Sequence, residues 1–245
     1  NSWDEYRNSI WHRVGYVNWG YEAIGRFDSW EQIANYPVDN DRKGNRTVVP
    51  GDIMYKDQNN DGVINYLDER PIGYRVDSTP TLNFGINLSA SWKGFDLAMD
   101  WTGSGMTSWN QCYETARPFQ NDGNSPDEVL KDAWHLSDIW DANSPLIPGK
   151  YPMVRLNTDE TSAYDKSSYW LHNVTYLKLR NLEVGYTFPK TWLNRTGISN
   201  LRLFVSGTNL LTLSNLSVMD TECASDNGLD YPPMRVINIG VNLKF

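Results

Sequence analysis

The stretch Arg235-Val-Ile-Asn-Ile-Gly-Val-Asn-Leu-Lys-Phe245 decides the fold class, because apolar and small polar residues alternate along it to the last residue of the sequence. A repeat of two residues places successive side chains on opposite faces of a β-strand. One face of this strand is apolar, and the other carries asparagine, glycine and lysine. The stretch therefore predicts a strand that separates an apolar from a polar environment.

The same alternation occurs earlier in the chain, over residues 81–93 and again over 95–102. Lys93-Gly94 between these segments predicts a tight turn. Strands of soluble proteins usually have about 5–6 residues, whereas membrane-spanning β-strands have about 9–11. The length of these segments favours strands that cross a membrane.

Three further strands are predicted from less regular patterns. Residues 169–188 alternate with a change of phase, which indicates a β-bulge near Arg180-Asn181. Residues 201–211 alternate before the pattern blurs, and residues 14–27 form the sixth predicted strand.

Composition narrows the function classes. The 245 residues carry a net charge of −8, which argues against nucleic-acid binding, since that needs clustered Lys and Arg. Apolar runs of about 20 residues, as a transmembrane helix needs, are absent from the sequence. Eleven Trp and fourteen Tyr favour a protein in contact with an interface that is apolar on one side and wet on the other.

These observations predict an all-β chain that supplies about six strands of a large antiparallel transmembrane β-barrel. An open sheet edge in lipid leaves backbone groups unpaired, so we expect another polypeptide segment to complete the barrel. Bacterial barrels alternate short periplasmic turns with long extracellular loops. We therefore expect residues 28–80, 103–168 and 212–234 to be extracellular loops, and Phe245 to be periplasmic.

Five blocks in the chain resemble the C-terminal region of the SusC/RagA family of TonB-dependent outer-membrane transporters. They are Gly51-Asp-Ile-Met-Tyr-Lys-Asp-Gln-Asn-Asn-Asp-Gly-Val-Ile-Asn65, Pro71-Ile-Gly73, Gly85-Ile-Asn-Leu-Ser-Ala-Ser-Trp-Lys-Gly-Phe-Asp-Leu97, Tyr176-Leu-Lys-Leu-Arg-Asn-Leu-Glu-Val-Gly-Tyr-Thr-Phe-Pro189 and Leu203-Phe-Val-Ser-Gly-Thr-Asn-Leu210.

The resemblance implies that residues 1–245 form the C-terminal part of a barrel of about 22 strands. It implies an importer of oligosaccharides or peptides, and no enzymatic activity, in the outer membrane of Gram-negative bacteria of the Bacteroides type. The partners implied are the remaining N-terminal barrel and plug segment, a SusD-like surface lipoprotein, the TonB complex acting through that N-terminal segment, and outer-membrane lipid.

One loop motif has the spacing of a calcium site. Calcium loops supply oxygen ligands from their first, third, fifth, seventh and twelfth positions, with a glycine at the sixth for the sharp turn. Asp57, Asn59, Asp61, Val63 and Asp68 occupy those five positions. The twelfth residue is Asp rather than the usual bidentate Glu. The sequence predicts a structural calcium ion here, and the alternative is an acidic turn without an ion.

The two cysteines, Cys112 and Cys223, both fall in predicted extracellular loops, where a disulfide is chemically allowed. The sequence does not fix the distance between them, so a disulfide and two thiols both stay open.

Aromatic residues of the loops could stack on a solute or could pack within the loops, and packing is the interpretation we favour for most of them. They are Trp109, Tyr113, Trp134, Trp140, Tyr151, Tyr164 and Trp170. Asp127-Glu128 follows Ser125-Pro126 and is typical of the acidic first turn of a helix rather than of a glycosidase pair. A secreted, calcium-stabilised, carbohydrate-binding β-sandwich is the alternative function.

Overall fold

A computed structural model describes residues 9, 11–75, 79–156, 161–194, 197–217, 219–222, 231 and 233–245. These residues form two compact units. The sheet unit comprises the described residues within 80–107, 174–222 and 231–245, and the loop unit comprises those within 9–79 and 108–173.

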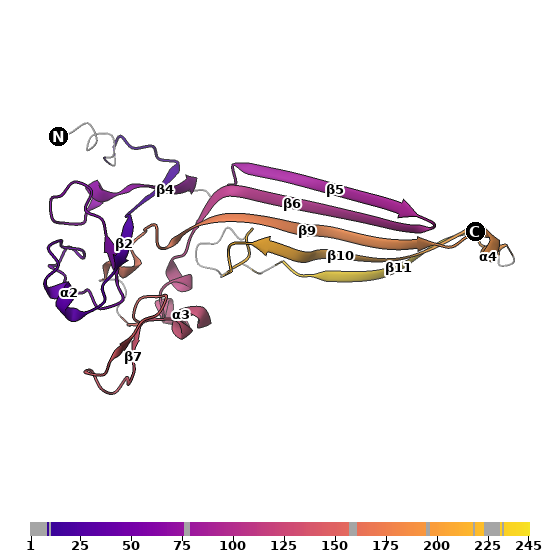
Figure 1. The fold of residues 1–245 in the computed structure, drawn as a ribbon. Coiled ribbons are helices and arrows are strands. Elements are labelled where there is room, and N and C mark those ends of the chain that lie inside the picture. The colour runs from indigo at the N-terminus through magenta and orange to yellow at the C-terminus, as the bar shows by residue number, and fades with distance from the viewer. Residues whose placement is uncertain are drawn as a thin grey trace. The chain divides into compact units, whose positions relative to one another are not determined.

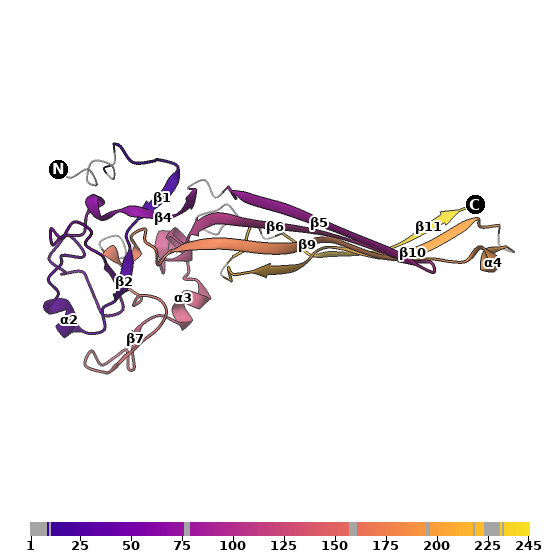
Figure 2. The same cartoon turned by 45° about the horizontal axis from the view of Figure 1, so that its top comes forward.

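Five long strands form one sheet with the order β11-β10-β9-β6-β5, so each strand lies beside the next of the set along the chain (Figure 1). Figure 2, turned by 45°, shows the twist of this sheet. The strands have from 9 to 17 residues, as expected for a membrane wall. They are β5 (Leu82–Trp92), β6 (Phe95–Asn110), β9 (Leu171–Thr187), β10 (Asn200–Ser214) and β11 (Val236–Lys244).

Strands β6 and β10 extend beyond the predicted strand limits, whereas β9 lies within the predicted segment 169–188. Strand β6 continues to Asn110, past residue 103, where the sequence placed the start of a long loop. Strand β10 continues to Ser214, and β11 begins at Val236. The connection between β10 and β11 therefore spans residues 215–235, whereas the sequence predicted a loop over residues 212–234.

The predicted tight turn between β5 and β6 is confirmed. Trp92 pairs with Phe95, so Lys93 and Gly94 form a two-residue hairpin loop. Both have positive φ, 49° and 92°, which is the signature of a type I′ turn. This turn matches the twist of the flanking strands and fixes the register of the hairpin.

The predicted irregularity at Arg180-Asn181 is also confirmed, although the extra residue lies on the neighbouring strand. Between the pairs Thr208 with Asn181 and Leu211 with Leu179, two residues of β10 lie opposite one of β9. One of the two residues on β10, Asn209, has φ of 53°. The bulge therefore lies beside the change of phase that residues 169–188 show.

The sixth predicted strand, residues 14–27, is not part of this sheet. Two short strands stand in its place in the loop unit, β1 (Val17–Gly20) and β2 (Ala23–Arg26). They pair with β4 (Arg70–Arg75) and β3 (Ile53–Tyr55), respectively. The prediction was wrong because the two strands follow each other after a short break and bond to different partners, which residue alternation does not reveal.

The helices are short. They are α2 (Trp30–Ala34), α3 (Asp127–Lys131) and α4 (Lys190–Leu193), with 3-10 turns η1 (Tyr66–Asp68), η2 (Tyr113–Thr115), η3 (Gln120–Asp122) and η4 (Ser162–Tyr164). Asp127 and Glu128 occupy the first turn of α3, as predicted. Within the described ranges, no helix is long and apolar enough to cross a membrane.

The loop unit has its own hydrophobic core. Tyr55 and Trp170 are almost fully buried in it, and each satisfies its polar atom with a backbone carbonyl, the hydroxyl of Tyr55 donating to Ser162 at 2.7 Å and Nε1 of Trp170 to Ala163 at 2.8 Å. Asn40, fully buried, joins the same region through Ile53 and Tyr55. Short strands β7 (His135–Leu136) and β8 (Leu146–Ile147) form a further hairpin. Residues predicted as loops therefore fold into a compact unit with a buried core.

Candidate functional site

One face of the sheet is apolar and the other is polar. The register of the strands places apolar residues of neighbouring strands side by side. Leu82, Phe84, Ile86 and Leu88 lie on one face of β5, opposite Gly105, Gly103, Trp101 and Met99 of β6. Val205 of β10 lies between Val184 of β9 and Ile239 of β11. The apolar side chains on this face are exposed, Ile239 at 82%. Soluble proteins rarely expose apolar patches above a few hundred Å², so this face suits lipid.

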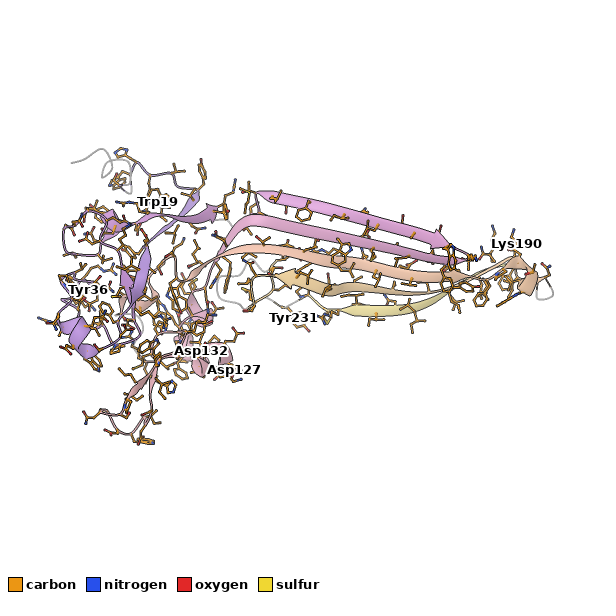
Figure 3. All side chains as sticks on the ribbon, viewed as in Figure 1. Trp19, Tyr36, Asp127, Asp132, Lys190 and Tyr231 are labelled. Carbon is orange, nitrogen blue, oxygen red and sulfur yellow. The ribbon has the colours of Figure 1, made fainter. Side chains whose placement is uncertain are left out.

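Aromatic rings gather at the end of the sheet that holds the tight turn, α4 and the C-terminus. Phe95 stacks near Tyr186 with ring centroids 4.6 Å apart, and Phe188 links Tyr186 to Trp192. Lys190, labelled in Figure 3, marks this end. Aromatic belts of this kind mark the level of the lipid headgroups in membrane barrels.

The opposite face of the sheet is polar and carries charged groups. Arg202 of β10 donates to Asp96 of β6 at 3.0 Å and to Glu183 of β9 at 2.6 Å. Asn181 of β9 donates to Asp100 of β6 at 3.2 Å. The pattern of residues along single strands did not reveal these contacts, because the partners lie on different strands.

Four of the predicted calcium residues lie in the loop between β3 and η1 of the loop unit, and the fifth, Asp68, is the last residue of η1. Asp57 accepts the backbone N–H of Asn60 at 2.7 Å and that of Gly62 at 2.8 Å. Asn59 accepts from Asp61, and Asp61 from Val63. Gly62 has φ of 82°, the conformation for which glycine is favoured at the sixth position.

The last predicted ligand, Asp68, anchors both ends of the loop. It is fully buried and accepts the backbone N–H groups of Gln58 and Asn65, each at 2.8 Å. Burial raises its pKa, the two N–H groups oppose that rise, and the charges of Asp57 and Asp61 add to it.

The loop is not a ready-made metal cage. Within the part of the chain that the structure describes, no group of three or more His, Cys, Asp or Glu side chains is placed to hold a metal ion. The carbonyl of Val63 accepts from the side chain of Asn65 at 3.2 Å. The residues match a calcium loop by type and order, and each carboxylate oxygen keeps a second lone pair, so the calcium ion stays a prediction.

Most loop aromatics are packed rather than available to a solute. Trp109, Trp134, Tyr151, Tyr164 and Trp170 are buried, whereas Tyr113 and Trp140 are exposed. Of the two cysteines, Cys112 is in the loop unit and Cys223 lies outside the described residues, so the predicted disulfide stays a prediction.

No protein-family model matches the chain. Several curated proteins are similar to it in sequence. TonB-dependent receptor P3 of Formosa agariphila is 30% identical over 242 residues, which cover 91% of this chain and 22% of that receptor. The chain belongs to the TonB-dependent receptors. SusC of Bacteroides thetaiotaomicron, also a TonB-dependent receptor, is 23% identical over 252 residues, which cover 96% of this chain and 20% of SusC. The predicted resemblance to the SusC/RagA family is confirmed.

Solved structures match the fold. A structure titled as that of the RagAB peptide transporter aligns with a TM-score of 0.58 at 21% identity, over 94% of this chain and 22% of that chain. The predicted fold class is therefore confirmed: the strands are part of an antiparallel outer-membrane β-barrel, and the sheet is open because the chain spans about a fifth of its relatives. Membership in these receptors places the chain at the outer membrane.

Proposed function

We propose that this chain supplies part of the barrel wall of a SusC-like importer that takes up oligosaccharides or peptides across the outer membrane. The observation that carries the proposal is the pairing of an exposed apolar face with a polar, charged face on five long strands. Lipid contacts the first face, and the second lines the path of the solute. The chain itself carries out no chemical reaction, and substrate specificity is set by the loops and the lumen.

The proposal includes partners that these residues do not contain. A further barrel and plug segment closes the sheet edges at β5 and β11, because unpaired strand edges are costly in lipid. A SusD-like lipoprotein covers the extracellular side, and the TonB complex supplies energy. Similarity to SusC and to the RagAB structure supports these assignments.

The tight turn at the aromatic end of the sheet supports one direction of the chain in the membrane. This end holds the two-residue turn at Lys93 and Gly94, and short turns are periplasmic in bacterial barrels. We therefore place Phe245 in the periplasm and the loop unit outside the cell. Residues 57–68 would then meet extracellular calcium, which would stiffen the loop without entering a reaction.

A secreted β-sandwich fits less well. A sandwich buries the apolar face of each sheet against a second sheet. Here the apolar side chains of β5 and β11 are exposed.

Fractionation and growth test the proposed function. The full receptor should be found in the outer membrane, and affinity purification followed by mass spectrometry should recover a surface lipoprotein. A strain that lacks the receptor gene should not grow when the imported oligosaccharide or peptide is the sole carbon or nitrogen source. Growth should return when the gene is restored. A receptor that is found in soluble fractions, or whose loss affects no such growth, contradicts the proposal.

A further inference from the structure

Three donors stand in a row on the polar face of β9. Tyr176, Lys178 and Arg180 are two residues apart, so their side chains share one face of the strand. Lys178 is only 2% exposed. A buried lysine needs close anionic partners, because removing its charge from water is otherwise costly.

Two carboxylates of the connection between β10 and β11 supply those partners. The ammonium of Lys178 donates to both carboxylate oxygens of Asp220, at 2.8 and 3.0 Å, and to Glu222 at 3.0 Å. Glu222 also accepts from the hydroxyl of Tyr176 at 3.0 Å and pairs with Arg180. Every donor of the row is therefore directed at a carboxylate.

One donor, Arg180, is held in place by the sheet itself. The guanidinium of Arg180 donates to the hydroxyl of Thr102 on β6 at 2.9 Å and to Asn209 on β10 at 3.4 Å. These contacts aim its remaining N–H groups without help from the connection. Donors that are held in place before the anion arrives bind it at a lower entropic cost.

The carboxylates come from residues outside any strand or helix. Asp220 accepts the backbone N–H of Glu222 at 2.9 Å, so the two side chains are held as a unit. Between them, the hydroxyl of Thr221 is covered but has no hydrogen-bond partner among the described residues. The fit of this segment to the donor row is therefore incomplete. Burial raises the pKa of Glu222, but its hydrogen bonds from Lys178 and Arg180 outweigh burial and lower the pKa below its usual value.

We infer that Tyr176, Lys178 and Arg180 form a carboxylate-binding site on the wall of the solute path, and that Asp220 and Glu222 fill it until a carboxylate-bearing solute displaces them. The ligand class is a carboxylate, such as the C-terminus of a peptide or an acidic sugar. Charge-assisted hydrogen bonds from Lys and Arg are the strong contacts for such a group. The inference rests on the proposed importer function, which puts the polar face in contact with solute.

The first test needs no variant. Hydrogen exchange of the amides of residues 219–222 is measured in the full receptor in detergent, with increasing succinate or with the neutral control succinamide. Succinate should speed exchange as it displaces the segment, and succinamide should not. Unchanged exchange with saturating succinate overturns the inference.

The second test uses lysine methylation, read by mass spectrometry. In the double variant Asp220→Asn, Glu222→Gln, the methylation rate of Lys178 should rise about tenfold or more, given what breaking a buried ion pair costs. Succinate should restore protection. The matched control Asp127→Asn breaks the exposed pair with Lys131 and should leave Lys178 unchanged. If Lys178 becomes reactive in the double variant and succinate does not protect it, the ion pairs have a structural role only and the inference is wrong. Failure of the growth test alone would leave these binding results intact.

Discussion

Arg202 on β10 reaches Asp96 on β6 across the strand that lies between them, with Nε of Arg202 3.0 Å from the carboxylate. The guanidinium passes over Gly185 of β9, where a Cβ atom would lie 2.4 Å from a guanidinium nitrogen. Glycine at this position therefore makes room for an ion pair that ties three strands together on the polar face.

Replacing Gly185 by Ala should displace Arg202 and weaken the sheet. The guanidinium is the far end of a flexible side chain, so the expected cost is that of the partly exposed ion pairs, about 0–1 kcal/mol. We expect a lower midpoint of urea unfolding for the full receptor, followed by the loss of the heat-modifiable gel band of the folded barrel. The control Gly105→Ala, which meets its nearest neighbour at 3.6 Å, should be far milder. Equal effects of the two variants would contradict the crossing of Arg202 over Gly185.

The stability of the receptor should depend on the two residues of the tight turn, Lys93 and Gly94. Gly94 has φ of 92°, and its Cβ would meet the carbonyl oxygen of Thr187 at 2.7 Å. Gly94→Ala should destabilise the receptor by about 1–2 kcal/mol from backbone strain alone. Lys93→Asn should be neutral or stabilising, because Asn accepts positive φ readily. The same unfolding experiment measures both, and a destabilising Lys93→Asn would argue against the type I′ turn.

Alternation along the sequence predicted the sheet because it is a local property. In β5 and β11, the alternation of apolar and polar residues within each strand is enough to identify the apolar face. The change of phase near Arg180 coincides with a bulge between β9 and β10. The short strands β1 and β2 were merged into one because their partners, not their own residues, define them.

The charged contacts of the polar face could not be predicted in the same way. Lys178 pairs with Asp220 across 42 residues, and Arg202 pairs with Asp96 across 106. Each of these residues looks solvated when its own segment is read alone. By contrast, the order of Asp57, Asn59 and Asp61 is local, so the sequence identified that turn before the structure showed its hydrogen bonds.

Calcium should stabilise the turn that contains Asp57 and Asp61. A ligand that binds only the folded state raises the free energy of unfolding by about 2.7 kcal/mol when its concentration is a hundred times its Kd. We expect a higher melting temperature of the full receptor in millimolar calcium than in a chelator, and loss of that difference in Asp57→Asn and Asp61→Asn. The variant Asp127→Asn, on exposed α3, should keep it. A melting temperature that calcium does not change in the unmodified receptor would exclude the ion.

Acid should loosen the segment around Asp41. This buried carboxylate accepts the backbone N–H groups of Lys43, Asn45 and Thr47 at 2.7–2.8 Å. Burial raises its pKa, but these bonds, with one from the hydroxyl of Thr47, outweigh burial and lower the pKa below its usual value.

A carboxyl with a lower pKa in the folded than in the unfolded state binds fewer protons when folded. The stability that Asp41 contributes is therefore fully present above its unfolded pKa of about 3.9, and it is lost as pH falls through the lower folded pKa. Amide protection of residues 43–47, corrected for intrinsic exchange, should fall below about pH 4. Asp41→Asn should start less protected at neutral pH and change little with acid, whereas Asp41→Ala should cost about 1–3 kcal/mol through unpaired N–H groups. An acid response in Asp41→Asn equal to that of the unmodified chain would assign the effect to another group.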